Sequence, residues 1–179
     1  VCKFSYYLKS IGLKKGDRVA AYVPNKIESI ISFLACAKNG IIWSSCSPDF
    51  GFQGVMDRFG QARPKILFAT DGYYYNGKAH SSLEKVRQIA QEIDSLEQVV
   101  VVELIASQEP SLSMINAVSY SDLLSEYESV TAIEFAQLPF DHPLYIMYSS
   151  GTTGMPKAIV HAHGGLLVEH LKALGLHAD

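Results

Sequence analysis

One polar stretch, residues 148–157, carries the side chains best suited to chemistry in this chain. It combines hydroxyl groups, glycines and one lysine, namely Ser149, Ser150, Gly151, Thr152, Thr153, Gly154 and Lys157. Successive backbone N–H groups in a tight loop can form a concave anion site, to which hydroxyl groups add donors and the lysine adds positive charge. These residue types at this spacing therefore indicate a site that binds polyphosphate.

The spacing excludes the two best-known phosphate loops. The G-x-x-x-x-G-K-[ST] motif is absent, because Ala158 follows Lys157 and Gly154 lies too close to that lysine. The G-x-G-x-x-G motif is absent from this stretch as well. The alternative is a surface turn rich in Ser, Thr and Gly. Such a turn rarely combines four hydroxyl groups, two glycines and a Pro-Lys exit within so few residues, so we favour phosphate binding.

Two apolar runs, 144–148 and 158–160, flank the polar loop and are typical of strands. Gly151 and Gly154 permit backbone angles and close approaches that a Cβ atom would forbid. We therefore expect a hairpin in which the phosphate loop joins two strands. A final helix should begin near Gly164.

The preceding part of the chain alternates between short apolar runs and amphipathic segments. The apolar runs, which are typical of buried strands, lie at 19–23, 41–43, 65–69 and 98–102. The expected helices lie at 4–11, 25–40, after 47–49, and from Ser81 onward. Strands that alternate with helices form βαβ units, so the predicted fold is α/β, with a doubly wound, mostly parallel sheet and flanking helices.

We expect the chain to divide into βαβ repeats (1–105), an irregular connector (106–143), and the phosphate-loop hairpin with its following helix (144–179). Two helix starts resemble capping boxes, in which Asn25 precedes Glu28 and Ser81 precedes Glu84 by three residues. Residues 47–49 can cap a third helix, and residues 71–78 are expected to form a loop after a strand. In the helix from Asn25, one face is apolar and carries Ile27, Ile30, Ile31, Leu34 and Ala37.

The composition excludes several classes of protein. Hydrophobic residues make up 48% of the 179 residues, which is enough for a sizeable core. The formal net charge is -3, so no basic excess suggests nucleic acid as a partner. The most apolar stretch, 27–43, is too short and too polar to span a membrane. The three cysteines have no metal-type spacing and cannot form a complete disulfide set, which favours reduced thiols in the cytoplasm.

The histidines near the end of the chain suggest a metal site, but the pattern does not favour one. His161, His163 and His170 lie close to Glu169, yet a strand followed by a helix would scatter their side chains. No cysteine or further ligand joins them, so we expect no metal site. A serine hydrolase is also excluded, because no serine lies in a G-x-S-x-G motif.

Residues 148–157 resemble the phosphate loop of the adenylate-forming superfamily, which includes acyl-CoA synthetases, luciferases and peptide-synthetase adenylation domains. Three further stretches, 43–51, 57–61 and 71–78, together with 148–165, resemble the branch of acyl-CoA synthetases that activates acetoacetate. The resemblance covers nearly the whole chain, and residues 106–140 are its least distinctive part. It implies the large N-terminal domain of such an enzyme.

The resemblance implies that ATP, Mg²⁺ and coenzyme A serve an acid–thiol ligase that uses acetoacetate in lipid synthesis. The ATP phosphates would be held by Ser149, Ser150, Gly151, Thr152, Thr153, Gly154 and Lys157, with Thr152 and Lys157 as catalytic residues. His161 would lie near the acyl substrate and Lys78 near coenzyme A. Relatives often carry arginine where Tyr74 stands, which weakens the expectation for Lys78. Small molecules, not nucleic acids or membranes, would be the partners.

The sequence contains no Tyr-Gly-x-Thr-Glu motif for adenine and no C-terminal lid with its lysine. In the superfamily both lie downstream of the phosphate loop. We therefore expect a fragment from the N-terminal region that is inactive by itself. Two alternatives stay open: a truncated product that only binds phosphate or a partner, and a related synthetase that acts on acetate or propionate.

Overall fold

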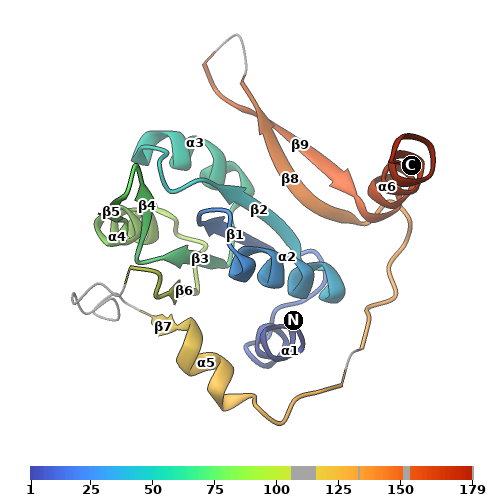
Figure 1. Ribbon diagram of the computed structural model, residues 1–179, viewed down its shortest axis with the longest axis horizontal. Coiled ribbons are helices and arrows are strands. Elements are labelled where there is room, and N and C mark those ends of the chain that lie inside the picture. Colours follow the sequence, from blue (N-terminus) through green and yellow to red (C-terminus); the bar gives the residue numbers. More distant parts are fainter. Residues whose placement is uncertain (106–115, 133, 151–153, 179) are drawn as a thin grey trace.

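The computed structural model describes residues 1–105, 116–132, 134–150 and 154–178. Seven strands form one sheet in the order β7-β6-β3-β1-β2-β8-β9 (Figure 1). Their bounds are Arg18–Tyr22 (β1), Ile42–Cys46 (β2), Ile66–Thr70 (β3), Gln98–Val102 (β6), Ala117–Ser119 (β7), Pro143–Ser149 (β8) and Lys157–Ala162 (β9). All neighbouring strands run parallel except β8 and β9. The predicted α/β fold with a mostly parallel sheet is confirmed.

Helices cover both faces of the sheet (Figure 1). The cluster on one face includes residues from α1 (Cys2–Ser10), α2 (Ile27–Asn39) and α5 (Tyr120–Glu126). The cluster on the other includes residues from α3 (Phe52–Ala62) and α4 (Leu83–Glu92). The last helix, α6 (His163–His177), follows β9. None of the helices among the described residues is long and apolar enough to cross a membrane.

Strand β1 shows why the central strands read as continuous apolar runs. Val19 and Ala21 belong to the core beneath α1 and α2, whereas Ala20 and Tyr22 belong to the core beneath α3 and α4. Successive side chains of a strand point to opposite faces. Because both faces are covered, every position of such a strand must be apolar or satisfied internally.

The strand order reverses direction next to β1. The connection through α2 leads from β1 to β2 on one side, and the connection through α3 then returns to β3 on the other side. Open α/β sheets bind their ligands outside the carboxyl ends of the strands at such a reversal. The carboxyl ends of β1, β2 and β3, together with that of β8, therefore mark the edge at which a site is expected.

Residues 71–78 were expected to be a loop, and that expectation is wrong. They form most of an antiparallel hairpin, with β4 at Gly72–Tyr75 and β5 at Lys78–Ser81. Its two-residue turn consists of Asn76 and Gly77, both with positive φ, 48° and 73°. Asn-Gly favours such a turn, because both residues tolerate the left-handed region. The sequence therefore contained the signal, which lay in the turn and not in the flanking residues.

Three expected helix caps are also wrong. Helix α2 has Lys26 and not Asn25 at its N-cap, and α3 has Gly51, beyond residues 47–49. Helix α4 has Ser82 at its N-cap without a side-chain capping bond. The expected stop of α2 at Gly40 is confirmed, since Gly40 has the left-handed φ of 71°.

The apolar face predicted for α2 is not the face that this structure buries. Ile27 and Ile30 are 66% and 51% exposed. The buried face instead carries small and polar residues, of which Ala35 and Cys36 join the apolar core and Lys38 and Asn39 bond to α1. The Lys38 ammonium donates to Ser5 Oγ at 2.9 Å, and Asn39 Nδ2 donates to the Ser5 carbonyl at 2.8 Å. Polar pairing between the two helices thus overrides the hydrophobic period.

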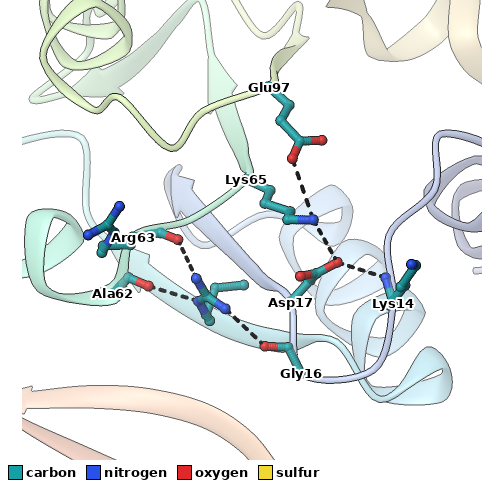
Figure 2. A network of polar contacts seen from close by, with 8 residues as sticks. Lys14, Gly16, Asp17, Ala62, Arg63, Lys65 and Glu97 are labelled. Atoms are coloured by element: carbon teal, nitrogen blue, oxygen red, sulfur yellow. Dashed lines mark hydrogen bonds and ion pairs between the residues drawn. The ribbon is translucent and has the colours of Figure 1, made fainter.

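A polar network closes the opposite edge of the sheet, where β1 and β3 begin (Figure 2). The Lys65 ammonium lies 3.2 Å from Asp17 and 3.4 Å from Glu97. Asp17 also accepts the backbone N–H of Lys14 at 2.8 Å. The Arg18 guanidinium donates to three backbone carbonyls, those of Gly16, Ala62 and Arg63. This edge is therefore an internally paired structure that joins β1 to the end of α3.

Candidate active site

The β8–β9 hairpin presents the two described ends of the phosphate loop. Ser149 pairs with Lys157 across the hairpin, and both are exposed, as are Ser150 and Gly154. Gly151, Thr152 and Thr153 lie outside the described residues, so the structure does not place these predicted contacts. The expected strand–loop–strand arrangement is present, with a hydroxyl and a cation facing each other where the loop begins and ends.

The hairpin register places three of the predicted site residues on one face. Ser149 pairs with Lys157, and His161 pairs with Tyr145, which lies four residues before Ser149. Directly paired residues of an antiparallel hairpin point to the same side, and every second residue shares that side. The His161 and Tyr145 rings are 5.0 Å apart. The face that carries Ser149 and Lys157 thus continues into an aromatic and histidine-containing surface.

Gly154 supplies a backbone shape at the end of the loop. Its φ is +95°, a conformation that side-chain-bearing residues rarely adopt, and a Cβ atom there would meet nothing within 4 Å. The glycine is therefore required by the backbone angle and not by crowding.

Helix α3 contacts the chain at both ends of the phosphate loop. The Tyr148 hydroxyl donates to the Arg58 carbonyl at 2.8 Å, and Gln61 Nε2 donates to the Pro156 carbonyl at 3.0 Å. The Arg58 guanidinium lies 4.6 Å from the centre of the Phe50 ring and 5.9 Å from that of Tyr148. Sequence reasoning noted residues 57–61 only as part of a resemblance and missed this role.

A groove opens where β2 and β8 separate. These strands pair only at Trp43–Tyr145 and Ser44–Ile146, whereas β1 pairs with β2 over five positions. Beyond the last pair the strands diverge around a groove of about 390 Å³. Its lining includes Trp43, Ser45, Cys46, Phe50, Arg58 and Tyr148. The groove therefore lies at the carboxyl edge of the sheet, beside the start of the phosphate loop.

A buried tyrosine supports the loop between β2 and α3. The Tyr22 hydroxyl lies 2.6 Å from the Pro48 carbonyl and 2.8 Å from the Phe50 carbonyl, and shares its proton between them. Burial raises the pKa of Tyr22 well above its usual value, so the hydroxyl stays protonated and remains a donor. These contacts hold the backbone at Phe50, whose ring lies beneath the Arg58 guanidinium.

Cys46 lies in the same groove but lacks the properties of a nucleophile. Burial raises the pKa of its thiol to about 11, although the nearby Arg58 charge acts in the opposite direction. A thiol with such a pKa is protonated near neutral pH and hence unreactive. Cys46 therefore serves the packing of the groove wall.

Lys78 does not join the other predicted residues. It is exposed at the start of β5 and pairs with Tyr75 across the Asn-Gly turn. Figure 1 places β4 and β5 beside α4, on the far side of α3 from the β8–β9 hairpin. The structure thus separates the expected coenzyme A contact from the phosphate loop.

The histidines near the end of the chain lie on two different elements. His161 lies on β9 and His163 is the first residue of α6. His163 instead faces His142, with ring centres 5.8 Å apart, and burial lowers its pKa, with a further effect of the His142 charge. Among the described residues, no group of three or more His, Cys, Asp or Glu side chains could hold a metal ion.

Known proteins resemble this chain along its whole length. Acetoacetyl-CoA synthetase of Macaca fascicularis is 48% identical over 183 residues, which cover 100% of this chain and 27% of that protein. Malonamoyl-CoA synthetase of Penicillium aethiopicum is 38% identical over 96% of this chain and 24% of its own length. The solved acetoacetyl-CoA synthetase from Streptomyces lividans matches with a TM-score of 0.91 and 42% identity, over 99% of this chain and 26% of that one.

This chain therefore spans about a quarter of the length of the relatives it matches. A family model described as "AMP-binding enzyme" matches residues 1–177. That match takes in both the helix-covered sheet and the hairpin that carries Ser149 and Lys157. The chain belongs to the family of AMP-binding enzymes.

Proposed function

We propose that this chain supplies the ATP-phosphate-binding part of an AMP-forming acid–thiol ligase that joins acetoacetate to coenzyme A. The observation that carries the proposal is the exposed pair of Ser149 and Lys157, where the phosphate loop of an AMP-binding family member begins and ends. The similarity to acetoacetyl-CoA synthetases supports acetoacetate as the acid. For the reaction, the acetoacetate carboxylate attacks the α-phosphate of ATP and releases pyrophosphate, and the coenzyme A thiolate then displaces AMP.

In this reaction the phosphate loop neutralises charge that moves onto the leaving pyrophosphate. Donors placed before the reaction stabilise such charge without reorganising during it. We assign the ATP phosphates to Ser149, Ser150, Gly151, Thr152, Thr153 and Gly154. Lys157 offsets phosphate charge at the end of the loop, and Thr152 and Lys157 act as the catalytic residues of this step.

Mg²⁺ would supply a further positive charge on the ATP phosphates. The described residues offer no cluster of carboxylates, histidines or cysteines for the ion. We therefore assign it no protein ligand in this part of the chain and derive no step from it.

The remaining assignments follow the same proposal. His161 shares the hairpin face with Lys157 and would lie near the acyl substrate. Lys78 would contact coenzyme A from its separate hairpin. We propose residues 1–105, 106–143 and 144–179 as the sheet core, the connector and the phosphate-binding unit, and the cytoplasm as the compartment in which acetoacetate is used for lipid synthesis. By itself, the 179-residue chain would bind phosphate without completing ligation.

The test is a chimera in which this chain replaces the matching segment of the Streptomyces lividans enzyme. Acetoacetate-dependent AMP formation is measured with the chimera and with its Lys157→Ala and Thr152→Val variants. We expect each variant to slow adenylation about 10²- to 10³-fold, the usual cost of removing one donor to a transition-state charge. Wild-type rates of pyrophosphate exchange in both variants would contradict the proposal.

The similarity to malonamoyl-CoA synthetase makes malonamate a second candidate for the acid. Malonamate and acetoacetate both carry a carbonyl group two carbons from the carboxylate and have nearly the same size. A panel of acetoacetate, malonamate, acetate and propionate separates the candidates by kcat/KM. We expect acetoacetate to rank first, and a higher value for either simple acid would assign the protein to another short-chain synthetase.

A further inference from the structure

Helix α3 is joined to the phosphate loop by two hydrogen bonds between residues far apart in the sequence. The Tyr148 hydroxyl reaches the Arg58 carbonyl at 2.8 Å over 90 positions, and Gln61 Nε2 reaches the Pro156 carbonyl at 3.0 Å over 95 positions. Tyr148 precedes Ser149, and Pro156 precedes Lys157. One helix thus holds the chain directly beside the two residues that face each other across the hairpin.

The two contacts lie on the face of the hairpin opposite Ser149 and Lys157. The register places Ser149 and Lys157 on one face of the hairpin, and Tyr148 therefore points to the opposite face, toward α3. Pro156 is buried although Met155 and Lys157 beside it are exposed. The bonds to α3 thus act on the face of the hairpin opposite Ser149 and Lys157, and both of these residues are exposed.

The environment of Arg58 reinforces the first contact. Its guanidinium lies 4.6 Å from the centre of the Phe50 ring and 5.9 Å from that of Tyr148, and Nη1 donates to the Gly54 carbonyl at 2.6 Å. No carboxylate among the described residues lies within 4.0 Å of it, so these ring contacts and this single bond hold the side chain. The cation–π attraction between Arg58 and the Tyr148 ring favours this position of the ring beside α3.

We propose that Tyr148 and Gln61 are positioning residues that hold the two ends of the phosphate loop on α3. The proposal rests on the proposed function, since it takes the phosphates of ATP as the ligand. Ordering a loop costs conformational entropy. Bonds that fix both ends before the ligand arrives reduce that cost and orient the backbone N–H groups.

The test uses hydrogen–deuterium exchange of the full 179-residue chain, with sodium tripolyphosphate as the probe. Gln61→Met removes the amide that donates to the Pro156 carbonyl and also, at 2.5 Å, to the Asp57 carbonyl within α3. Tyr148→Phe removes the hydroxyl that donates to the Arg58 carbonyl, and neither change alters the charge. The matched controls are Gln53→Met, which removes a bond to the Asp57 side chain within the same helix, and Tyr75→Phe, on the exposed β4–β5 hairpin. Exchange is compared in peptides that span 148–158 and in those from the sheet.

We expect faster exchange in peptides spanning 148–158 for both test variants without tripolyphosphate, and about two- to tenfold more tripolyphosphate for half-protection. The controls and the sheet peptides should match the unmodified chain. In the chimera with the Streptomyces enzyme, KM for ATP should rise by the same factor while kcat changes less. A merely structural role would instead reduce the folded fraction at constant KM.

The outcomes separate this inference from the proposed function. Loop exchange equal to that of the controls in both test variants would overturn the positioning role, whatever the activity. Faster loop exchange in the variants, with no protection by tripolyphosphate even in the unmodified chain, would keep the positioning role and reject phosphate as the ligand.

Discussion

The two edges of the sheet use polar residues in opposite ways. At the edge where β1 and β3 begin, Lys65 pairs with Asp17 and Glu97, and Arg18 donates to three backbone carbonyls (Figure 2). At the edge where β8 ends, Ser149 and Lys157 are exposed, and no carboxylate among the described residues pairs with that lysine. The charged groups at the first edge are paired within the protein, whereas Ser149 and Lys157 at the second edge are available to a ligand.

This difference shows how the same residue types serve stability or binding. A lysine or arginine that is satisfied by the protein cannot also neutralise a phosphate without breaking those contacts. Substitutions at the first edge should therefore change the free energy of unfolding and leave phosphate binding intact. Substitutions at the second edge should do the reverse.

The largest effect on stability is expected for Arg18→Met. The change removes charged donors from the carbonyls of Gly16, Ala62 and Arg63, and hydrogen bonds to charged groups contribute about 1.5–3 kcal/mol. Urea unfolding should show a loss of about 2–3 kcal/mol, while half-protection by tripolyphosphate stays unchanged in the folded fraction.

The control for Arg18 is Arg87→Met on α4. Arg87 forms an exposed ion pair with Glu84 at 2.7 Å, and such surface pairs contribute less than about 1 kcal/mol. Equal losses in the two variants would show that the contacts of Arg18 do not join β1 to α3 in the way described above.

Much of the fold was predictable from sequence, because local patterns determine it. The strands that are buried on both faces appear in the sequence as continuous apolar runs. The hairpin appears as two apolar runs on either side of a polar loop. The pattern failed at α2, where hydrogen bonds of Ser5 with Lys38 and Asn39 bury the polar face and leave Ile27 exposed. Pairing offsets the cost of burying polar groups, and a pattern of apolar residues along one helix does not show a polar partner on another helix.

The candidate site was predictable in its residue types but not in its support. Glycine, hydroxyl and lysine spacing identifies the loop, since these groups are close in sequence. The bonds from α3 to Tyr148 and Pro156 join residues 90 and 95 positions apart, for which no local pattern exists. The position of Lys78 was unpredictable for the same reason. Only the tertiary structure shows that the β4–β5 hairpin lies on the far side of α3 from the phosphate loop.

A smaller effect, now on binding, is expected for Gly154→Ala. At a φ of +95° a residue with a side chain adopts a backbone conformation that costs about 1–2 kcal/mol. The added methyl group itself would clash with nothing, because no atom lies within 4 Å of it. Tripolyphosphate affinity should fall about five- to thirtyfold with little change in overall stability.

Gly165→Ala is the matched control for Gly154. Gly165 lies in α6 without a positive φ, and a Cβ atom there meets nothing within 4 Å. That variant should keep its affinity and should lose no stability, since alanine favours a helix more than glycine does. Unchanged affinity in Gly154→Ala would mean that the left-handed angle is not part of the binding conformation.

The smallest effects are expected within the ion-pair network around Lys65, where the two partners differ in exposure. The Asp17 side chain is 15% exposed and also accepts the Lys14 N–H, whereas Glu97 is 54% exposed. Water and salt screen the more exposed pair. Double-mutant cycles with Lys65→Met should therefore give a larger coupling energy with Asp17→Asn than with Glu97→Gln, and high salt should reduce the Glu97 coupling by the larger fraction.

The pH dependence of this coupling has a defined sign. The hydrogen bond to Asp17, aided by the charges of Asp17 and Glu97, raises the pKa of Lys65 above its usual 10.5. The stabilisation is fully present below the pKa that Lys65 has in the unfolded state and disappears as the pH rises through its folded-state pKa.

A coupling with Glu97 that matches or exceeds that with Asp17, or any change in tripolyphosphate affinity in these variants, would contradict the division of roles between the two edges.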